Sequence, residues 1–307
     1  MVRVLLCGTN YGAAYLRVLR PAGILGRSER SRAMAAHCGV PFYRSVDEAR
    51  EIDAAVVAIS GDAGREITTA LLERGVHVLA EHPQWFAEVA AHRRTAREHG
   101  AVYHVNAHYS DIEAAAAFVA TFRAMRSRVL FVNLLSNPRA LYSAIELLAR
   151  AIGPLQGVEL EVLPHAPGSF FTIARAGVLT IQVQNSFSPV DDGSGNWVSH
   201  NVTAGFEEGV LTLAEAQGPL TWMPAPPSVG QLQAGAALWN RPLWQMLAAP
   251  PPAFGDYVNG GRERANGIAL ARFAAEVHTG VTPPEQSDAH LLGVSAVWEQ
   301  LVRPVTV

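Results

Sequence analysis

Two short segments of the sequence carry side chains that can donate a proton. The first reads Glu81-His82-Pro83, and the second ends in His108-Tyr109. Histidine titrates near neutral pH, and a tyrosine phenol can act as an acid when it is suitably placed. We expect His82 and Tyr109 to be catalytic, with His108 as a third candidate. The alternative is a structural hydrogen bond for each histidine and packing at a domain junction for the tyrosine.

The elements around these segments predict how they come together. Short apolar runs typical of buried strands lie at Val2–Cys7, Gly23–Leu25, Phe42–Tyr43, Asp53–Ile59, Val76–Ala80 and Val102–Asn106, with helical stretches between most of them. This alternation predicts a parallel sheet with right-handed crossovers. The carboxyl ends of parallel strands lie at one edge, where such sheets bind their ligands. We therefore expect the segments after the fifth and sixth strands to meet there.

A glycine turn follows the first strand and reads Gly8-Thr9-Asn10-Tyr11-Gly12-Ala13. In the dinucleotide fingerprint, the three glycine positions allow a tight turn, a close approach of the pyrophosphate, and close packing of helix on strand. Gly8 and Ala13 fit the first and third positions, and Asn10, which tolerates positive φ, stands at the second. We expect the residues from Gly8 to Gly12 to hold cofactor phosphates. The alternative is a plain strand-to-helix turn.

The segment Gly26-Arg27-Ser28-Glu29-Arg30 lies where NAD enzymes usually carry an acidic residue that binds the ribose 2′-hydroxyl. Two arginines and a serine suit a 2′-phosphate, because guanidinium binds phosphate through paired hydrogen bonds. Arg27, Ser28 and Arg30 therefore predict NADPH, although Glu29 opposes this and solvated loop charges are the alternative. We also assign Ser60, Glu81, His82 and Pro83 to the cofactor site.

The pattern changes after Asn106. Long helices are predicted at Ile112–Arg126, Arg139–Ile152, Arg262–His278 and Ser287–Val302, and alternation of period two from Gly157 to Trp222 predicts a mostly antiparallel sheet. With 307 residues, two domains are expected. We predict an α/β protein with an N-terminal Rossmann domain (residues 1–107, doubly wound parallel sheet) and a C-terminal α+β domain (residues 108–307). Asn106, Arg139, Tyr142 and Ser143 are candidates for the substrate side.

Composition excludes several classes of function. The net charge of −3 gives no field for binding nucleic acid. No apolar run is long enough for a bilayer and no leader is visible, so a cytoplasmic enzyme is expected. His104 and His108 span a strand end and lack an acidic partner at suitable spacing, so no metal site is predicted. The absence of a G-x-S-x-G motif argues against a serine nucleophile.

The two-domain outline, with Glu-His-Pro after the fifth strand, resembles the Gfo/Idh/MocA oxidoreductases. Most of these carry lysine where His82 stands, as the acid/base for oxidising sugar alcohols, so His82 argues against a sugar dehydrogenase. The segments VLLCGTNYGAAYL, GILGRSERSR, GVHVLAEHP and SNPRALYSAIELLARAIG, in this order, resemble more closely the thiazolinyl imine reductases of yersiniabactin and pyochelin siderophore assembly. This resemblance runs from residue 4 to residue 303.

The resemblance implies an NADPH enzyme that reduces the C=N bond of a thiazoline to a thiazolidine. Its substrate would be held on a carrier protein of a nonribosomal peptide synthetase, and Trp222–Tyr257 is a candidate docking segment. His82 and Tyr109 match the positions proposed as general acids in that family, whereas His108 departs from the aromatic residue expected there. A homodimer is expected by analogy. Two alternatives are another Gfo/Idh/MocA enzyme acting on a free sugar or cyclic imine, and a catalytically silent NADP-binding regulator.

Overall fold

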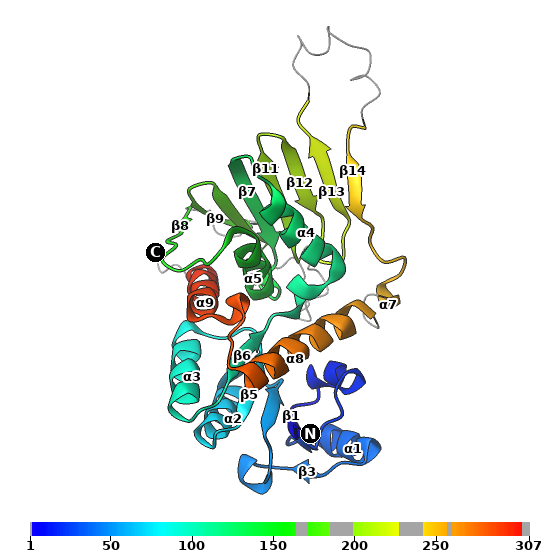
Figure 1. Ribbon diagram of the computed structural model, residues 1–307, viewed down its shortest axis with the longest axis vertical. Helices are drawn as coiled ribbons and strands as arrows, with labels where there is room; N and C mark the ends of the chain where they lie inside the picture. Colours follow the sequence, from blue (N-terminus) through cyan, green and yellow to red (C-terminus); the bar gives the residue numbers. More distant parts are fainter. Residues whose placement is uncertain (1, 164–170, 185–198, 227–241, 257–259, 303–307) are drawn as a thin grey trace.

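The computed structural model describes residues 2–163, 171–184, 199–226, 242–256 and 260–302. Its two β-sheets lie one above the other along the long axis of the molecule, with helices between them (Figure 1). The predicted docking segment Trp222–Tyr257 lies partly outside the described residues, because 227–241 and 257 are not among them.

The first sheet has the strand order β3-β2-β1-β4-β5-β6, and every pair is parallel. Its strands are β1 (Val4–Cys7), β2 (Gly23–Leu25), β3 (Phe42–Tyr43), β4 (Ala54–Val57), β5 (His77–Glu81) and β6 (Tyr103–Asn106). All four residues of β4 are buried, as expected for a strand covered on both faces. The order reverses between β1 and β4, which is the point where Rossmann sheets bind dinucleotides. The predicted doubly wound sheet is confirmed.

The connections of this sheet end at recognisable signals. They are η1 (Gly12–Arg17), α1 (Glu29–Cys38), η2 (Val46–Glu48), α2 (Gly61–Glu73) and α3 (Phe86–Glu98). The Ser28 side chain caps the start of α1 by accepting from the Ser31 amide, and Gly39 ends it at a φ of 64°. The helix predicted after the glycine turn is a short 3₁₀ helix, η1, rather than an α-helix.

The second sheet has the order β14-β13-β12-β11-β7-β10-β9-β8. Its strands are β7 (Val129–Ser136), β8 (Glu161–Val162), β9 (Phe171–Ala176), β10 (Leu179–Gln184), β11 (Asn201–Phe206), β12 (Gly209–Leu213), β13 (Leu220–Pro224) and β14 (Gln245–Ala248). All pairs are antiparallel except β7 with β10. The mostly antiparallel sheet is confirmed, but its central strand β7 and its edge strand β14 were not predicted.

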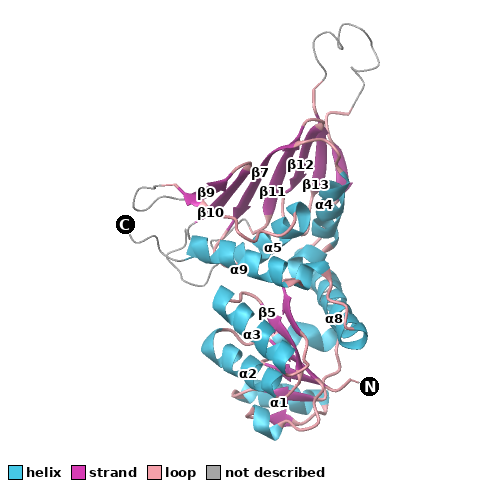
Figure 2. Ribbon diagram, turned by 60° about the vertical axis from the view of Figure 1, so that its left-hand side comes forward, coloured by secondary structure: helices cyan, strands magenta, loops and turns pink. Residues whose placement is uncertain are grey.

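The helices of the second half pack under this sheet and against the first one (Figure 2). They are η3 (His108–Asp111), α4 (Glu113–Ala124), α5 (Leu141–Ile152), α7 (Phe254–Asp256), α8 (Arg262–Thr279), η6 (Pro284–Gln286) and α9 (Asp288–Val302). Helix α5 is buried along nearly its whole length beneath β7, and α8 runs between the two sheets. Because α8 and α9 also contact elements of the first sheet, the division into residues 1–107 and 108–307 stays a prediction.

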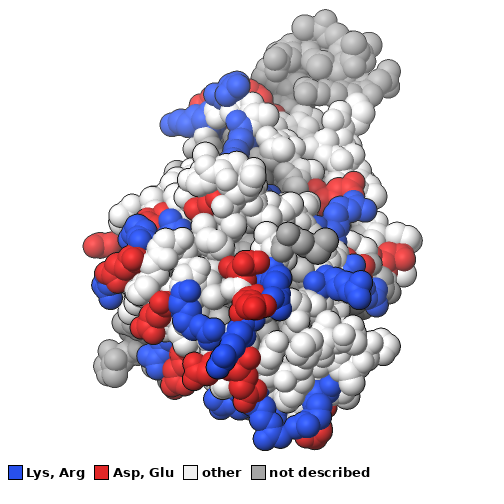
Figure 3. Space-filling model, turned by 60° about the horizontal axis from the view of Figure 1, so that its bottom comes forward, with Lys and Arg blue, Asp and Glu red and all other residues white. Residues whose placement is uncertain are grey.

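On the face shown in Figure 3, arginine and acidic side chains are interspersed, with no broad region of one sign. In the part of the chain that the structure describes, no helix has the length and apolar character needed to cross a membrane.

Candidate active site

The glycine turn between β1 and η1 has the geometry that only glycine supports. Gly8 has a φ of +85°, and a Cβ there would lie 2.6 Å from Ile59 Cγ1 and 2.8 Å from the Ala58 carbonyl oxygen. Its amide donates to the Leu25 carbonyl at 2.9 Å, which ties the turn to β2. Glycine therefore lets the turn pack closely against the segment that follows β4, which is the tight turn that the first position of a dinucleotide fingerprint requires.

A cavity of about 730 Å³ opens over this turn. It is lined by eight of the residues that the sequence assigned to the cofactor: Gly8, Thr9, Asn10, Tyr11, Arg27, Ser28, Arg30 and Ser60. Gly12 does not line it; this residue is buried and packs against Leu6 and Ala58. Thr9 and Ser31 share a hydrogen bond of 2.8 Å between their hydroxyl groups, which joins the turn to the start of α1.

Basic residues outnumber acidic ones in the lining of this cavity. Arg27, Arg30 and the unpredicted Arg44, which follows β3, line it together with one acidic residue, Glu66. Glu29 does not line it and instead lies 3.5 Å from the Nε atom of Arg32. The acidic residue that opposed NADPH in the sequence is thus not part of the cavity lining.

A second cavity, of about 550 Å³, continues from the first, since Tyr11, Ala58, Ile59 and Ser60 line both. It lies at the carboxyl ends of β5 and β6 and brings together the predicted chemistry-bearing residues Glu81, His82, Pro83, His108, Tyr109 and Arg139. Asn137, Ser199 and Arg262, which sequence reasoning missed, complete much of the opposite wall.

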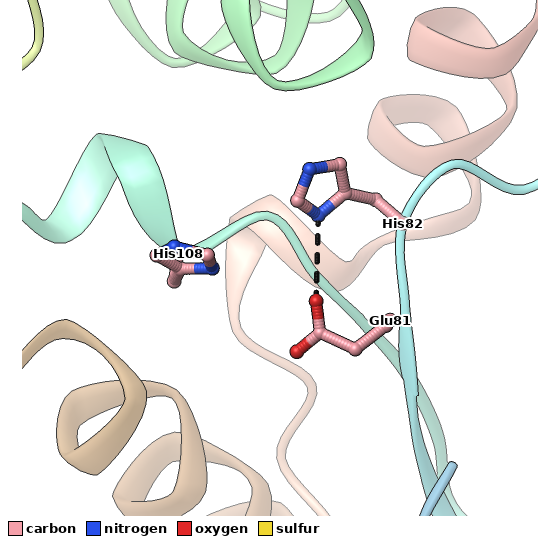
Figure 4. A group of neighbouring side chains, drawn as sticks. All are labelled: Glu81, His82 and His108. Carbon is pink, nitrogen blue, oxygen red and sulfur yellow. Dashed lines mark ion pairs between the residues drawn. The ribbon is translucent and has the colours of Figure 1, made fainter. Parts of the chain in front are cut away.

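His82 is held at the end of β5 by contacts on several sides. Its Nδ1 atom lies 2.7 Å from the Asn106 carbonyl oxygen, which can only accept, so Nδ1 carries a proton and Nε2 is left for a ligand. The ring stacks on Tyr142 at 5.8 Å between centroids, and Nδ1 lies 3.7 Å from Glu81 (Figure 4). These contacts fix the tautomer and orientation that a proton donor needs.

His108 faces His82 from η3, with 6.0 Å between the ring centroids (Figure 4). The ring is buried, and neither nitrogen has a hydrogen-bond partner among the described residues. Burial, followed by the nearby charges of His82 and Arg262, holds the pKa of His108 well below its usual value of 6.5. His108 is therefore neutral at physiological pH, with one N–H and one lone pair available in the cavity wall.

Tyr109 lies between two imidazole rings. Its ring is 4.4 Å from that of His108 and 4.3 Å from that of His200, at interplanar angles of 27° and 24°. It meets His82 edge to face at 6.2 Å. His82 and Tyr109 thus present two possible proton donors to one cavity.

Three predicted substrate residues do not line this cavity. Asn106 is buried and donates from Nδ2 to Glu81 and to Asn266, both at 3.0 Å. Tyr142 is buried with its hydroxyl 3.2 Å from that of Ser295, and Ser143 bonds His200 at 2.8 Å. These residues support the groups that line the cavity, and their predicted contact with substrate stays untested.

The histidine pair considered for a metal does not converge, because the Nε2 atom of His104 bonds Glu276 at 2.6 Å, away from His108. The structure instead groups Glu81, His82 and His108, which each place one possible ligand atom within 4.8 Å of the others. Within this group, Glu81 already accepts hydrogen bonds from Tyr15 and Asn106. Nδ1 of His82 donates a hydrogen bond to the Asn106 carbonyl. That this protein has no metal site therefore stays a prediction.

Residues 2–107 match the Gfo/Idh/MocA family model, an oxidoreductase family with an NAD-binding Rossmann fold. No curated protein matches the sequence significantly. The fold is similar to an oxidoreductase from Agrobacterium radiobacter in complex with NAD⁺, L-tartaric acid and magnesium, at 12% identity and a TM-score of 0.72, over 97% of this chain and 94% of that one.

Two further solved structures are similar over nearly the whole chain. A UDP-N-acetylglucosamine 3-dehydrogenase from Acidithiobacillus ferrooxidans has 14% identity and a TM-score of 0.69, over 97% of this chain and 95% of that one. A biliverdin reductase from Synechocystis, in complex with biliverdin and NADP⁺, has 16% identity and a TM-score of 0.66, over 97% and 98%. At these identities the likeness concerns the fold.

Proposed function

We propose that this protein is an NAD(P)-dependent oxidoreductase of the Gfo/Idh/MocA type, whose family model residues 2–107 match, and that it is a thiazolinyl imine reductase. It reduces the C=N bond of a thiazoline to a thiazolidine on a carrier-tethered nonribosomal peptide intermediate during siderophore assembly. The observation that carries the proposal is the pair His82 and Tyr109 on a cavity continuous with the dinucleotide cavity. The sequence contains no lysine, so the usual acid/base of the sugar-oxidising relatives has no counterpart.

The reaction needs a hydride at the imine carbon and a proton at the ring nitrogen. NADPH, when bound, supplies the hydride. The residues of this chain supply the proton and hold the ring. Because Nδ1 of His82 is bonded to the Asn106 carbonyl, His82 donates from Nε2 only as the imidazolium. Tyr109 carries a transferable proton in its neutral phenol, and neutral His108 offers an N–H to the substrate without adding positive charge.

The cofactor is NADPH rather than NADH in this proposal. Three arginines, Arg27, Arg30 and Arg44, line the first cavity against one acidic residue, Glu66, and can supply the charge-assisted hydrogen bonds that a 2′-phosphate needs. Glu29 is paired with Arg32 and does not line this cavity. Gly8 supports a dinucleotide in general, because it permits the tight turn at positive φ beside Ile59 and Ala58 and also lines the cavity.

The partners follow from the resemblance and from one exposed surface. A carrier protein presents the thiazoline, and the reaction takes place in the cytoplasm, where free Cys7 and Cys38 stay reduced. We assign the homodimer contact to the face of the second sheet opposite α4 and α5 (Figure 2). Phe131 and Met223 lie in one row across the strands and are 37% and 51% exposed, and Phe131 alternates with the buried Val132 on β7. Light scattering of the Phe131→Ser variant tests this contact, and a dimer of unchanged stability would refute it.

The test of the function is NADPH oxidation with a thiazoline thioester, either on its carrier protein or as a free pantetheine analogue. Reduction of the carrier-bound thiazoline to a thiazolidine, identified by mass, is the expected result. Equal turnover of the free analogue would favour an enzyme of free small molecules. NADPH binding without NADPH oxidation by either thiazoline, and without reduction of NADP⁺ by sugars, would favour a catalytically silent regulator.

A further inference from the structure

The ring of His200 covers the face of Tyr109 that lies away from His108, at 4.3 Å and 24°. His200 directly precedes β11 and is about ninety positions from Tyr109 in the sequence. It is 1% exposed, and it does not line the second cavity. Its contact with the site is therefore made through Tyr109.

Two polar partners hold the His200 ring in this orientation. Its Nε2 atom lies 2.8 Å from the Ser143 hydroxyl, and Nδ1 lies 3.4 Å from a carboxylate oxygen of Glu215. Glu215 is itself anchored, because it accepts from the Ser199 amide at 3.0 Å. Three elements, α5, the start of β11 and the turn after β12, thus converge on one imidazole.

The protonation states agree with a fixed, uncharged ring. Burial lowers the pKa of His200, and the Glu215 carboxylate opposes this only in part. Burial alone raises the pKa of Glu215, but the contacts with His200 and the backbone amides lower it overall. Among the charged and titratable groups of other elements, His82 meets the Tyr109 ring edge to face, Arg262 lines the same cavity, and the charge of Glu146 on α5 acts on both His108 and His200.

We propose that His200 is the positioning residue of Tyr109, which it holds between two imidazole rings so that the phenol points at the substrate nitrogen. This rests on the proposed role of Tyr109 as a proton donor. A tyrosine on the short helix η3 can swing about its χ1 torsion, and stacked rings on both faces limit that motion. Misplacement of a reacting group by about 1 Å can cost roughly a hundredfold in rate.

A buried polar triad is a costly way to fill space, since an apolar side chain would pack there without needing partners. The contacts of the two ring nitrogens with Ser143 and Glu215 set the angle at which the His200 ring lies. This is a reason for a polar residue at a buried position where an apolar one would pack more favourably. Histidine also keeps the stacked surface of an aromatic ring. A positioning role therefore predicts that the rate falls further when a substitution at His200 removes the ring than when it keeps one.

The test is a double-mutant cycle of His200 and Tyr109, measured as kcat with saturating NADPH and with substrate varied. His200→Asn removes the ring, and we expect a ten- to hundredfold lower kcat, by the order of magnitude above, with unchanged affinity for NADPH. In the Tyr109→Phe background, His200→Asn should cause no further loss. His200→Phe keeps a stacked ring but loses both polar contacts, and it should recover only part of the rate lost in His200→Asn. The matched control is His92→Asn, since His92 is also buried against a tyrosine, Tyr103, at 5.1 Å, but outside both cavities.

Three results would overturn the proposal: full kcat in His200→Asn, losses that multiply with that of Tyr109→Phe, or an equal loss in His92→Asn. An unchanged rate in Tyr109→Phe would also overturn it, because His200 would then have no donor to position.

A readout without substrate separates this proposal from the proposed function. In protein labelled with fluorotyrosine, the Tyr109 resonance is assigned by its absence in Tyr109→Phe. We expect it to shift and broaden in His200→Asn, as the ring becomes free to move, and to shift and broaden less in His200→Phe, which keeps a stacked ring. A failure to reduce thiazolines would refute the proposed function alone, whereas an unperturbed Tyr109 resonance in His200→Asn would refute the positioning role.

Discussion

Arg27 and Arg30 provide a quantitative prediction about cofactor choice. Both line the first cavity and both are exposed, so a phosphate held by them stays partly solvated. A charge-assisted hydrogen bond contributes about 1.5–3 kcal/mol, and exposure favours the lower end of that range. About 1.4 kcal/mol corresponds to a factor of ten, so Arg27→Ala and Arg30→Ala should each lower kcat/KM for NADPH roughly tenfold. The double variant should lose roughly a hundredfold if the two effects add.

The assay compares kcat/KM for NADPH and for NADH in each variant at low and high salt. NADH should be affected little, because it lacks the 2′-phosphate, and the loss for NADPH should shrink as salt screens the exposed charges. The matched control is Arg32→Ala, because Arg32 lies on α1 as Arg30 does but pairs with Glu29 and does not line the cavity. Equal losses for both cofactors, or a wild-type enzyme that prefers NADH, would refute the reasoning.

Three other predictions concern single positions. Tyr109→Phe should lower kcat by roughly 10²–10⁴-fold, the usual contribution of general acid catalysis, without weakening NADPH binding in a fluorescence titration; an unchanged kcat would contradict its role. Gly8→Ala should weaken NADPH binding by displacing the turn, whereas Gly39→Ala, with a similar positive φ but nothing within 4 Å, should lower only the melting temperature; equal NADPH affinity in both would contradict the phosphate turn. Burial alone raises the pKa of Glu146, but Arg150, then His290 and Ser110, lower it from 4.5 to about 2. The stability that this carboxylate contributes is therefore present above pH 4.5 and lost as the pH falls towards 2, and Glu146→Gln should reduce that dependence in urea unfolding. An unfolding free energy with the same pH dependence in Glu146→Gln as in the wild type would contradict it. The control is Glu161→Gln, a variant at an exposed position.

The Rossmann half could be predicted nearly element by element. Each of its strands is a short apolar run followed by a helix signal, and Ser28 and Gly39 mark the ends of α1 as capping rules require. The 3₁₀ form of η1 was not predicted, because the apolar spacing after the glycine turn also fits an α-helix.

The central strand of the second sheet was the main omission. β7 reads VLFVNLLS, without clear alternation, and it lies between two strong helix patterns. Its ladder partners, β10 and β11, lie more than forty positions away, so pairing rather than local sequence makes it a strand. β14 was missed for a similar reason, since four residues at a sheet edge give little periodic signal.

The site was predicted where its residues follow strands of the parallel sheet, because topology brings those strand ends together. His82, His108 and Tyr109 all reach one cavity in this way. Asn106 differs because it is the last residue of β6, and its side chain is buried among Tyr15, Glu81 and Asn266 instead of facing the cavity. Ser199, His200 and Arg262 come from distant elements with no motif of their own, so only the packing of the second half onto the first reveals them.

The central claim concerns the transfer of hydride to a carrier-bound thiazoline. The most direct measurement supplies NADPH deuterated at its transferable position and determines the mass of the intermediate released from the carrier protein. The account predicts a thiazolidine that carries one deuterium on the former imine carbon and ordinary hydrogen on nitrogen, and loss of this product in the His82→Ala, Tyr109→Phe double variant. Recovery of the unreduced thiazoline from the wild-type enzyme, or a product without deuterium, would contradict it.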